Sequence, residues 1–365
     1  MKIMHWIGID DHADKWTIAH VEGHDEKPNK VFEVVPDQKG FRRLVAYVKG
    51  LTGEVRVVYE AGPCGFDLYR RLRAAKIDCQ VAAPSLTPTK PGDKVKTNRR
   101  DASKLARYLR SGNLTLIVVP DEKQESLRDL VRQRASVQRD VGRVKKQIIH
   151  LLLRYGHRFR DGKAWTQKFW HWLKKTELTG AHSRFVLNDM MTELEHRIDQ
   201  LKHYDEAIHE ASRLPEYAPY VDGLRTLRGI DTLSAMTILS ELGDLRRFPT
   251  APQLMAAIGL VPGESSTGDT TTRLSITKTG NAHVRHIAVE AAWHYGRGAR
   301  VGRVVRARRV NQPPELVAIA EKCDKRLSKK FYRLTSRRKK STIAAVAVAR
   351  ELIGFIWAIG QIVHP

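Results

Sequence analysis

Three carboxylates stand where a folded sheet could bring them together. Asp10 ends the apolar stretch HWIGID, Glu60 ends EVRVVYE, and Asp101 opens the helix-like run RRDASKLARYLRSG. Asp11 is an alternative to Asp10, but the predicted strand ends more naturally at Asp10. Two strand ends and a helix across the sheet could gather such acids around Mg²⁺, which prefers oxygen ligands and acts on phosphodiesters. The alternative is that each acid only ends a strand or complements a helix dipole.

The surroundings of Asp101 are strongly basic. The stretch KVKTNRRDASKLARYLRSG, residues 94–112, contains a single acid. An acid among bases repels a polyanion unless a cation lies between them. A bound metal removes this conflict, because the acid then faces the metal while the neighbouring bases hold phosphate. The bases assigned to phosphate are Lys94, Lys96, Arg99 and Arg100.

Composition favours a nucleic-acid partner for these groups. The chain has 365 residues, of which 42% are hydrophobic, which suffices for two domains or three small ones. The formal net charge is +24 and the pI is about 10.1. The positive excess is spread over the whole chain, so its field attracts polyanions. The alternative is a basic protein that binds RNA for structural reasons alone.

Weaker signals concern location and membranes. Three cysteines without CxxC spacing argue against a disulfide framework or a zinc site and fit a reducing cytosol. No signal peptide is evident in MKIMHWIGIDDHADK. The C-terminal TIAAVAVARELIGFIWAIGQIV is long and apolar, but Arg350 and Glu351 near its middle would each cost about 2.5–3.5 kcal/mol in a bilayer. We expect a cytoplasmic protein without a membrane partner, with this segment as a buried helix.

The elements that position the acids and bases fall into three parts. Residues 1–118 show three early strands and then strand–helix alternation, which predicts a mixed-sheet α/β domain. Residues 119–213 predict two long helices, near 121–155 and 184–212, that form an antiparallel arm. Their interrupted apolar stripe fits packing within a bundle, and the alternative is a coiled coil that dimerises the protein.

Residues 214–365 predict a mostly helical third part. VDGLRTLRGIDTLSAMTILSELGDLRRF predicts two helices around an RGI hairpin. Such a hairpin can hold a phosphate on backbone N–H groups, although most glycine turns of this kind only cap a helix. GLVPGESSTGDTTTRLSITKTGNAH predicts a polar, glycine-rich loop of small hydroxyl residues, which is followed by basic helices.

Taken together, these motifs resemble a known family. IGID, VVYEAGPCGFDLYR and KPGDKVKTNRRDASKLARYL resemble the N-terminal domain of the DEDD transposases of the IS110 insertion-sequence family. LRGIDTLSAMTILSELGDLRRF, AAIGLVPGESSTGD and ITKTGNAHVRHIAVEAAWHY resemble its C-terminal transposase domain. The resemblance covers essentially the whole chain. It implies a RuvC-like (ribonuclease H-type) domain with four acids, a helical arm and a C-terminal domain with a catalytic serine.

The resemblance also implies an activity and partners. The expected enzyme is a site-specific DNA recombinase, guided by a structured non-coding bridge RNA that pairs with donor and target DNA. It would require Mg²⁺, work as a homo-oligomer (dimer or tetramer) and act in the bacterial cytoplasm at the nucleoid. The alternatives are a metal-dependent nuclease of the junction-resolvase kind, in which water attacks, and a non-catalytic RNA- or DNA-binding protein.

Carried over by residue, the resemblance leaves one acid position open. Asp10, Glu60 and Asp101 match the first, second and fourth acids of the family. The third is expected one helical turn before Asp101, where Asn98 stands. Its amide oxygen can ligate a hard cation, but without charge. Either Asn98 is a neutral ligand, or Asp93 substitutes, or metal binding is weakened.

The family's serine stands after GLxP in a Ser–Gly or Ser–Ser–Gly stretch, which in this chain is ESSTG. We assign Ser266 as the attacking hydroxyl, with Thr267 second and Ser265 third, because a primary alcohol is less crowded than a β-branched one. A serine-linked DNA end would conserve the phosphodiester energy for rejoining. The alternative is a flexible loop without chemistry.

Further bases extend the expected nucleic-acid surface. ARVGRVVRARR and SKKFYRLTSRRKK are strongly basic stretches without an acid. Phosphate contacts give affinity but no sequence choice, which suits a protein whose specificity comes from base pairing. A solvated basic face is the alternative. The residues assigned to nucleic acid here are Lys278, Arg285, Arg303, Arg337 and Arg338.

Overall fold

The structure is a computed structural model that describes residues 3–88, 97–267, 270–298 and 300–364. Asp93, Lys94 and Lys96 lie outside the described residues. The chain divides into two compact units, Met1–Pro120 and Asp121–Pro365. Both of the long helices predicted from the sequence belong to the second unit.

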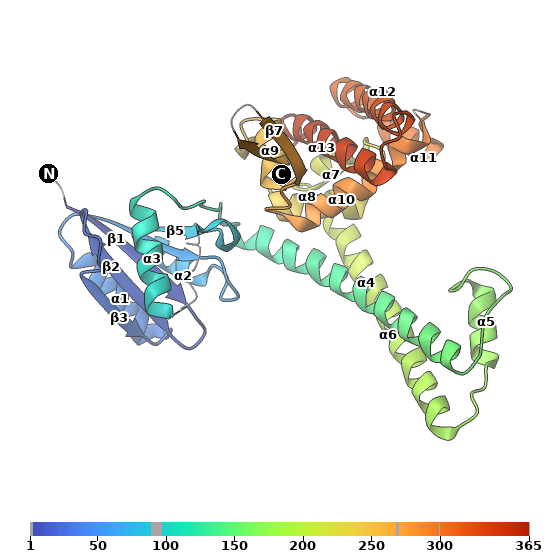
Figure 1. Ribbon diagram of the computed structural model, residues 1–365, viewed down its shortest axis with the longest axis horizontal. Coiled ribbons are helices and arrows are strands. Elements are labelled where there is room, and N and C mark those ends of the chain that lie inside the picture. The colour runs from blue at the N-terminus through green and yellow to red at the C-terminus, as the bar shows by residue number, and fades with distance from the viewer. Residues whose placement is uncertain (1–2, 89–96, 268–269, 299, 365) are drawn as a thin grey trace. The chain divides into compact units, whose positions relative to one another are not determined.

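The first unit is built on a five-stranded mixed sheet (Figure 1). The spatial order of the strands is β3-β2-β1-β4-β5, with β1 antiparallel to β2, β2 antiparallel to β3, and β1, β4 and β5 mutually parallel along the sheet. The mixed α/β sheet predicted from the sequence is therefore confirmed. The strands are β1 (Met4–Asp11), β2 (Trp16–Glu22), β3 (Lys30–Val34), β4 (Glu54–Glu60) and β5 (Asp78–Ala82).

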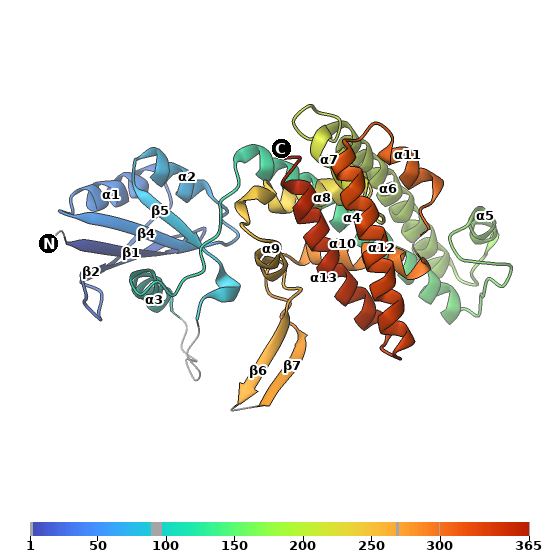
Figure 2. The same cartoon turned by 90° about the horizontal axis from the view of Figure 1, so that it is seen from above.

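Helices cover both faces of this sheet. Figure 2 shows α1 (Gln38–Lys49) and α2 (Asp67–Ala74) on one face and α3 (Asn98–Arg110) on the other. Strand side chains alternate between the faces. Ile7 and Ile9 of β1 belong to the core under α1 and α2, whereas Gly8 faces α3. A Cβ atom on Gly8 would lie 2.1 Å from the carbonyl oxygen of Ala102, so only glycine lets α3 approach this closely.

Helix α3 is specified locally at both its start and its buried face. Thr97 is its N-cap, and the Thr97 hydroxyl accepts a hydrogen bond from the backbone N–H of Arg100. Asp101 lies in the first turn, where a carboxylate complements the helix dipole. The side chains turned to the sheet are small or apolar and recur at helical spacing: Ala102, Leu105, Ala106 and Leu109.

The second unit begins with two long antiparallel helices, α4 (Glu122–Arg154) and α6 (Ala181–Ala211), with the short α5 (Gln167–Lys175) between them (Figure 1). The Arg134–Asp205 ion pair, at 2.8 Å, and the Arg143–Glu193 pair, at 2.9 Å, step in opposite directions along the two helices. The predicted apolar stripe of α4 packs against α6 and the C-terminal helices. A coiled coil between two copies stays a prediction.

The rest of the second unit is mostly helical, as predicted. Helices α7 and α8 flank the RGI turn, where Gly229 has a φ of 79° and a Cβ would lie 2.7 Å from the Cα of Ala291. The turn therefore requires glycine, both for its conformation and for its contact with α10. The helices are α7 (Ala218–Arg225), α8 (Thr232–Leu242), α9 (Ala251–Ala257), α10 (Ala282–Ala292), α11 (Arg303–Arg309), α12 (Pro314–Ser336) and α13 (Ser341–Gly360).

The hydroxyl-rich segment is not the loop expected from its composition. It forms an antiparallel hairpin of β6 (Pro262–Thr267) and β7 (Thr270–Ile276), which extends from the helical body in Figure 2. A loop was predicted because glycine and serine are common in turns, and the run of threonines in the same segment was given too little weight. Threonine is β-branched and favours the extended backbone of a strand.

Helix α13 packs inside the second unit. Within the described ranges it is the one helix long and apolar enough to cross a membrane, with a mean hydropathy of 1.8. One face of the helix, including Val348 and Leu352, is completely buried in the core, whereas Ile343 near its start is exposed. Glu351 accepts hydrogen bonds from Arg326 and Lys330 of α12. These contacts are those of a core helix.

Candidate active site

The ends of β1 and β4 place two of the predicted acids side by side in the sheet. Ile9 of β1 pairs with Tyr59 of the parallel β4, so Asp10 and Glu60 each follow one residue later. Asp10 lies two residues after Gly8 and therefore faces α3. Glu60 lies two residues after Val58, which packs in the small apolar cluster beneath α3. Both carboxylates thus belong to the α3 face.

The first turn of α3 lies over the same end of the sheet. Across the antiparallel strands, Asp10 pairs with Thr17 and Thr17 pairs with Glu33. The Nε atom of Arg99, in the first turn of α3, lies 3.9 Å from Glu33 Oε1. This turn also contains Asn98 and Asp101. The fold therefore brings the start of α3 to the row of the sheet that contains Asp10.

Asp11 has a different role from Asp10, although β1 runs one residue further than predicted and ends at Asp11. The indole Nε1 of Trp16 donates a hydrogen bond of 2.8 Å to Asp11 Oδ1. Trp16 belongs to the core under α1 and α2, so Asp11 is engaged on the opposite face. Burial raises the pKa of Asp11, despite the opposing effect of the Trp16 hydrogen bond.

The donor set at the α3 face suits a hard cation in its chemistry. Carboxylate and amide oxygens are the protein ligands that Mg²⁺ prefers. Thr17, opposite Asp10, is fully buried, and its hydroxyl has no hydrogen-bond partner among the described residues. His12 Nε2 lies 3.3 Å from Asp10 Oδ2. In the part of the chain that the structure describes, no three His, Cys, Asp or Glu side chains are grouped closely enough to hold a metal ion.

The hydroxyl candidates lie on the β6–β7 hairpin. Ser265 pairs with Thr272, Ser266 with Thr271 and Thr267 with Thr270. Ser265 is exposed. The hairpin leads through Gly280 into the N-terminus of α10, where Asn281 is the N-cap and accepts a hydrogen bond from the backbone N–H of Val284. Because α10 begins soon after the hairpin ends, the position of α10 helps to determine the position of the base of the hairpin.

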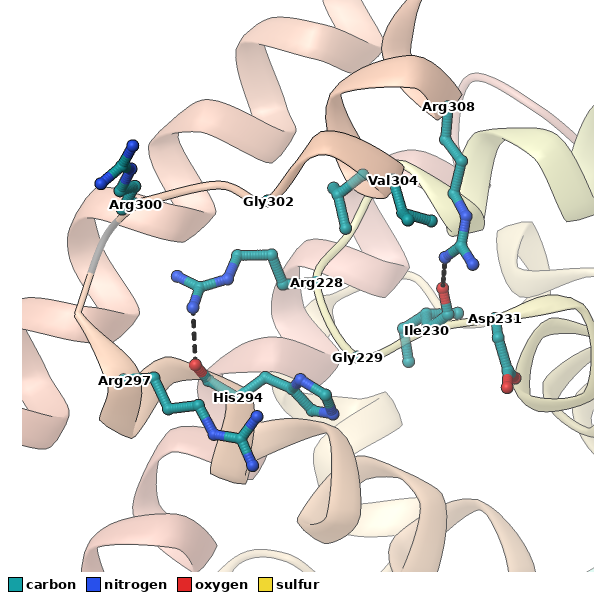
Figure 3. A pocket seen from close by; sticks show the side chains of 11 residues that line it. Arg228, Gly229, Ile230, Asp231, His294, Arg297, Arg300, Gly302, Val304 and Arg308 are labelled. Atoms are coloured by element: carbon teal, nitrogen blue, oxygen red, sulfur yellow. Dashed lines mark hydrogen bonds between the residues drawn. The ribbon is translucent and has the colours of Figure 1, made fainter.

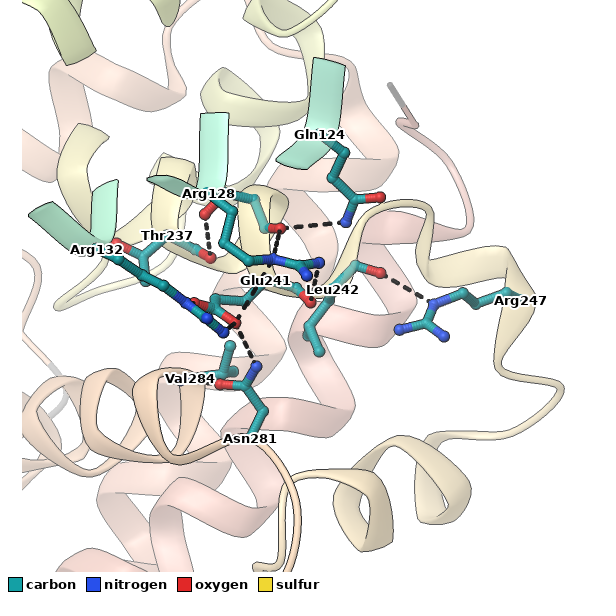
Figure 4. Close-up of polar contacts among 10 residues, drawn as sticks. Gln124, Arg128, Arg132, Thr237, Glu241, Leu242, Arg247, Asn281 and Val284 are labelled. Carbon is teal, nitrogen blue, oxygen red and sulfur yellow. Dashed lines mark hydrogen bonds and ion pairs between the residues drawn. The ribbon is translucent and has the colours of Figure 1, made fainter. Parts of the chain in front are cut away.

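A buried acid ties α10 to the long helix α4 (Figure 4). Glu241 of α8 accepts two hydrogen bonds from the Arg132 guanidinium, at 2.7 and 2.9 Å, and one of 2.6 Å from the Asn281 amide. Burial raises the pKa of Glu241, but the hydrogen bonds from Arg132 and Asn281 outweigh it and leave the pKa below its ordinary value. Glu241 is therefore a charged link between α4, α8 and the helix that follows the hairpin.

Known proteins match both ends of the chain. Residues 7–157 match a family model described as a transposase, and residues 221–301 match the transposase IS116/IS110/IS902 family. A relative from Sinorhizobium fredii, named as transposase y4qE, is 40% identical over 98% of this chain and 88% of its own length. The transposase for insertion sequence element IS1533 of Leptospira borgpetersenii is 30% identical over 93% of this chain and 99% of its own length. The chain belongs to the IS110 family of transposases.

This membership makes the protein a DNA transposase, with DNA as its substrate. It also implies a divalent metal, for which the candidate ligands are the acids of the N-terminal unit. In the transposase, those acids lie on the first unit and the hydroxyl hairpin on the second.

The bases assigned to nucleic acid differ in how available they are. In the transposase, Arg99, Arg100, Lys278 and Arg303 are exposed, and so are Arg337 and Arg338 at the end of α12. Arg285 is half-buried, and its guanidinium donates a hydrogen bond of 2.8 Å to the carbonyl oxygen of Ile258. Its contact therefore holds α10 against the end of α9, a structural role that the sequence analysis did not foresee.

Sequence reasoning missed two buried charged groups of the transposase. Glu241 is an acid inside the apolar TILSEL, and Arg228 precedes the glycine of the RGI turn; both are buried. The signal available for Glu241 was a charge on the otherwise apolar face of a helix, since such a charge is normally paired. Nothing in the sequence identified the partners, which lie 109 and 40 residues away.

Proposed function

We propose that this transposase is a site-specific recombinase that cuts and rejoins DNA through a serine-linked intermediate and is guided by a structured RNA. The observation that carries the proposal is the convergence of Asp10, Glu60 and the first turn of α3 on one end of a sheet, in a chain that also presents a hydroxyl-rich hairpin. The assignment of the sheet as RuvC-like belongs to the proposal. It is supported by the mixed strand order and by acids at neighbouring parallel strand ends.

The acids would hold the divalent metal. We assign Asp10, Glu60 and Asp101 as charged ligands and Asn98 as a neutral one, and Mg²⁺ as the ion, because every donor is an oxygen. When bound, the metal would stabilise negative charge on the phosphate oxygens. The residues themselves must be fixed in direction, and their places at strand ends and in a capped helical turn favour this.

The hydroxyl of Ser266 would attack the phosphorus of a scissile phosphodiester. Its oxygen gives up its proton and forms the new P–O bond, the P–O bond to one deoxyribose oxygen breaks, and the departing oxygen takes up a proton. The product is a DNA end esterified to serine, and attack by a second DNA hydroxyl reverses the step and rejoins the strands. Thr267 and Ser265 are the alternative nucleophiles, in that order.

The guide RNA and the oligomer are further parts of the proposal. The net charge of +24 and the exposed basic residues on both units suit a protein that binds nucleic-acid backbones, while base pairing between RNA and DNA selects the target sites. We expect donor DNA, target DNA and a bridge RNA to bind a dimer or tetramer in the bacterial cytoplasm. Sequencing the RNA that co-purifies with the protein tests the guide directly.

A denaturing gel tests the chemistry and separates it from two alternatives. Labelled DNA that runs with the protein after denaturation supports serine attack. Cleavage without such a linkage supports a metal-dependent nuclease in which water attacks, an alternative favoured by the acids at the strand ends. Binding with neither result would point to a non-catalytic RNA- or DNA-binding protein, an alternative that Asn98 in place of a fourth acid keeps open.

A further inference from the structure

A basic pocket lies between the RGI turn and helix α11 (Figure 3). Its volume is about 450 Å³, and four arginines and a single aspartate line it. We propose that this pocket binds one phosphodiester group of a nucleic-acid backbone. The inference rests on the nucleic-acid partner of the proposed function and is independent of the serine and the metal.

The floor of the pocket is a buried cation. Arg228 is 7% exposed, and its guanidinium donates hydrogen bonds to the carbonyl oxygens of His294, at 2.6 Å, and Gly298, at 2.7 Å. Within the described ranges no carboxylate forms an ion pair with Arg228. The nearby acid Asp324 is itself paired with Arg309 at 2.7 Å. The guanidinium also lies over the ring of Tyr295, 5.1 Å from its centroid. A buried positive charge held by neutral oxygens and an aromatic ring, with no carboxylate paired to it, favours an anion beside it.

A second guanidinium is fixed on the opposite wall. Arg308 of α11 donates a hydrogen bond of 3.0 Å to the carbonyl oxygen of Ile230, which ties α11 to the RGI turn. Arginines held by backbone carbonyls keep their charge in place without neutralising it, so less conformational entropy is lost when a ligand binds. The glycine of the turn, Gly229, leaves the pocket floor without a side chain.

The rim of the pocket carries two uncommitted cations. Arg297 and Arg300 are exposed, and neither forms an ion pair with another described residue. Burial, together with the charges of Arg297 and Arg228, lowers the pKa of His294. The arginine contributions to this shift have the sign expected of a positively charged pocket, and burial is the larger cause. In Figure 3, Arg297 and Arg300 come from the segment that follows α10, on the side of the pocket to which the Arg228 guanidinium extends.

The one acid of the lining does not neutralise the pocket. Asp231 is the N-cap of α8, and its Oδ1 accepts a hydrogen bond of 2.8 Å from the backbone N–H of Ser234. Figure 3 shows its carboxylate directed away from Arg228. Asp231 therefore serves the helix, and its one negative charge offsets only part of the positive charge of the four arginines.

The chemistry of the lining selects a phosphodiester in preference to a base. Among the described residues that line the pocket there is no Asn or Gln, and the polar groups are mainly cationic donors, which suit phosphate oxygens. Such contacts position a backbone without reading its sequence. DNA and RNA both supply this group, so the experiment compares the two.

The test is the double variant Arg297→Gln/Arg300→Gln in the full-length protein. The matched control is Arg158→Gln/Arg160→Gln, which removes the same charge from exposed positions between α4 and α5. Binding of a labelled DNA duplex of arbitrary sequence and of a labelled RNA hairpin is followed by fluorescence anisotropy at several KCl concentrations. EDTA is present, so cleavage does not contribute.

We expect the pocket variant to bind about tenfold more weakly than the control, and its slope of log affinity against log salt to fall by about one. A loss with duplex alone identifies DNA as the source of the phosphate, and a loss with hairpin alone identifies RNA. Equal affinities for pocket and control variants would overturn the proposal. A protein that binds normally here but forms no serine-linked DNA leaves the pocket standing and removes the proposed chemistry.

Discussion

Glu241 and Arg132 form a two-point ion pair in which both carboxylate oxygens accept hydrogen bonds from one guanidinium, at 2.7 and 2.9 Å. The Glu241 side chain is 1% exposed, whereas that of Arg132 is 48% exposed. The pair therefore joins the solvent-facing side of α4 to the interior of α8. Since Asn281 binds the same carboxylate, three helices depend on one charge.

Replacing this charge tests its structural weight. We expect Glu241→Gln to lower the free energy of unfolding of the second unit by about 2 kcal/mol, because a partly buried guanidinium loses its counter-ion. Urea denaturation of the full-length protein measures the change. The exposed Glu290→Gln on α10 is the control and should stay within about 0.5 kcal/mol of wild type. Identical midpoints for the two variants would show that the pair contributes nothing to stability.

Removal of a metal ligand should separate reaction from binding. We expect Glu60→Gln and Asp101→Asn each to abolish strand cleavage while leaving nucleic-acid affinity intact, because the metal serves the reaction more than binding. Cleavage of labelled DNA and anisotropy binding measure the two properties. Asp14→Asn, in the exposed turn after β1, is the matched control and should cleave normally. Full activity in either ligand variant would remove that residue from the metal site.

Asn98 offers a gain-of-function test. Asn98→Asp would give the first turn of α3 a second carboxylate, one helical turn before Asp101. We expect the Mg²⁺ concentration for half-maximal cleavage to fall several-fold, because a charged oxygen replaces a neutral one. Asn113→Asp, exposed beyond the end of α3, should change nothing. An unchanged Mg²⁺ requirement in Asn98→Asp would place Asn98 away from the metal and leave Asp93 as the candidate.

Three alanine variants identify the attacking hydroxyl. We expect Ser266→Ala to eliminate the covalent DNA adduct and Thr267→Ala to weaken it only partly, because a primary alcohol reaches phosphorus with less crowding. Ser265→Ala should retain it. Peptide mapping of the trapped adduct locates the ester. A phosphodiester on Thr267 or Ser265 would contradict the assignment, and cleavage without any adduct would favour attack by water.

A histidine pair should make the first unit sensitive to acid. His5 and His20 share a buried hydrogen bond of 2.9 Å, and Tyr47 contacts the other nitrogen of His20 at 2.8 Å. Burial, followed by the charge of His5, lowers the pKa of His20 below 6.5. The unfolded chain therefore binds more protons, so stability falls as the pH drops below about 6.5 and levels off below the folded pKa.

The variant His20→Gln should flatten this pH dependence, whereas the exposed His24→Gln should leave it unchanged. Thermal unfolding of the full-length protein at a series of pH values provides the measurement. The same slope in wild type and His20→Gln would assign the acid sensitivity to other groups.

Local pattern was enough to predict the first unit. The apolar stretches HWIGID and EVRVVYE located β1 and β4, and the helix-like run RRDASKLARYLRSG located α3. Because parallel strands end at the same edge, the neighbourhood of Asp10 and Glu60 followed from those elements. The backbone arrangement of the candidate acids was therefore accessible from sequence, whereas the directions of their side chains were not.

What the sequence could not provide depends on contacts between distant segments. Buried Arg228 donates its hydrogen bonds to carbonyl groups that lie 66 and 70 residues further along the chain. The partners of Glu241 are also remote in sequence, and the spacing of residues within a single helix does not identify them. The hairpin was missed for a different reason, since glycine and serine in its sequence favour turns while its threonines favour strands, and pairing between β6 and β7 decided the outcome.

The bare backbone at Gly8 has a consequence for how copies of such an element decay. A single-base change that turns this codon into alanine would place a methyl carbon 2.1 Å from the Ala102 carbonyl oxygen, so α3 would have to lift from the sheet. The gene would still encode every candidate acid and hydroxyl residue of the site. A copy that retains every candidate catalytic residue can therefore have lost the packing of α3 against the sheet, which its acids and hydroxyls would not reveal.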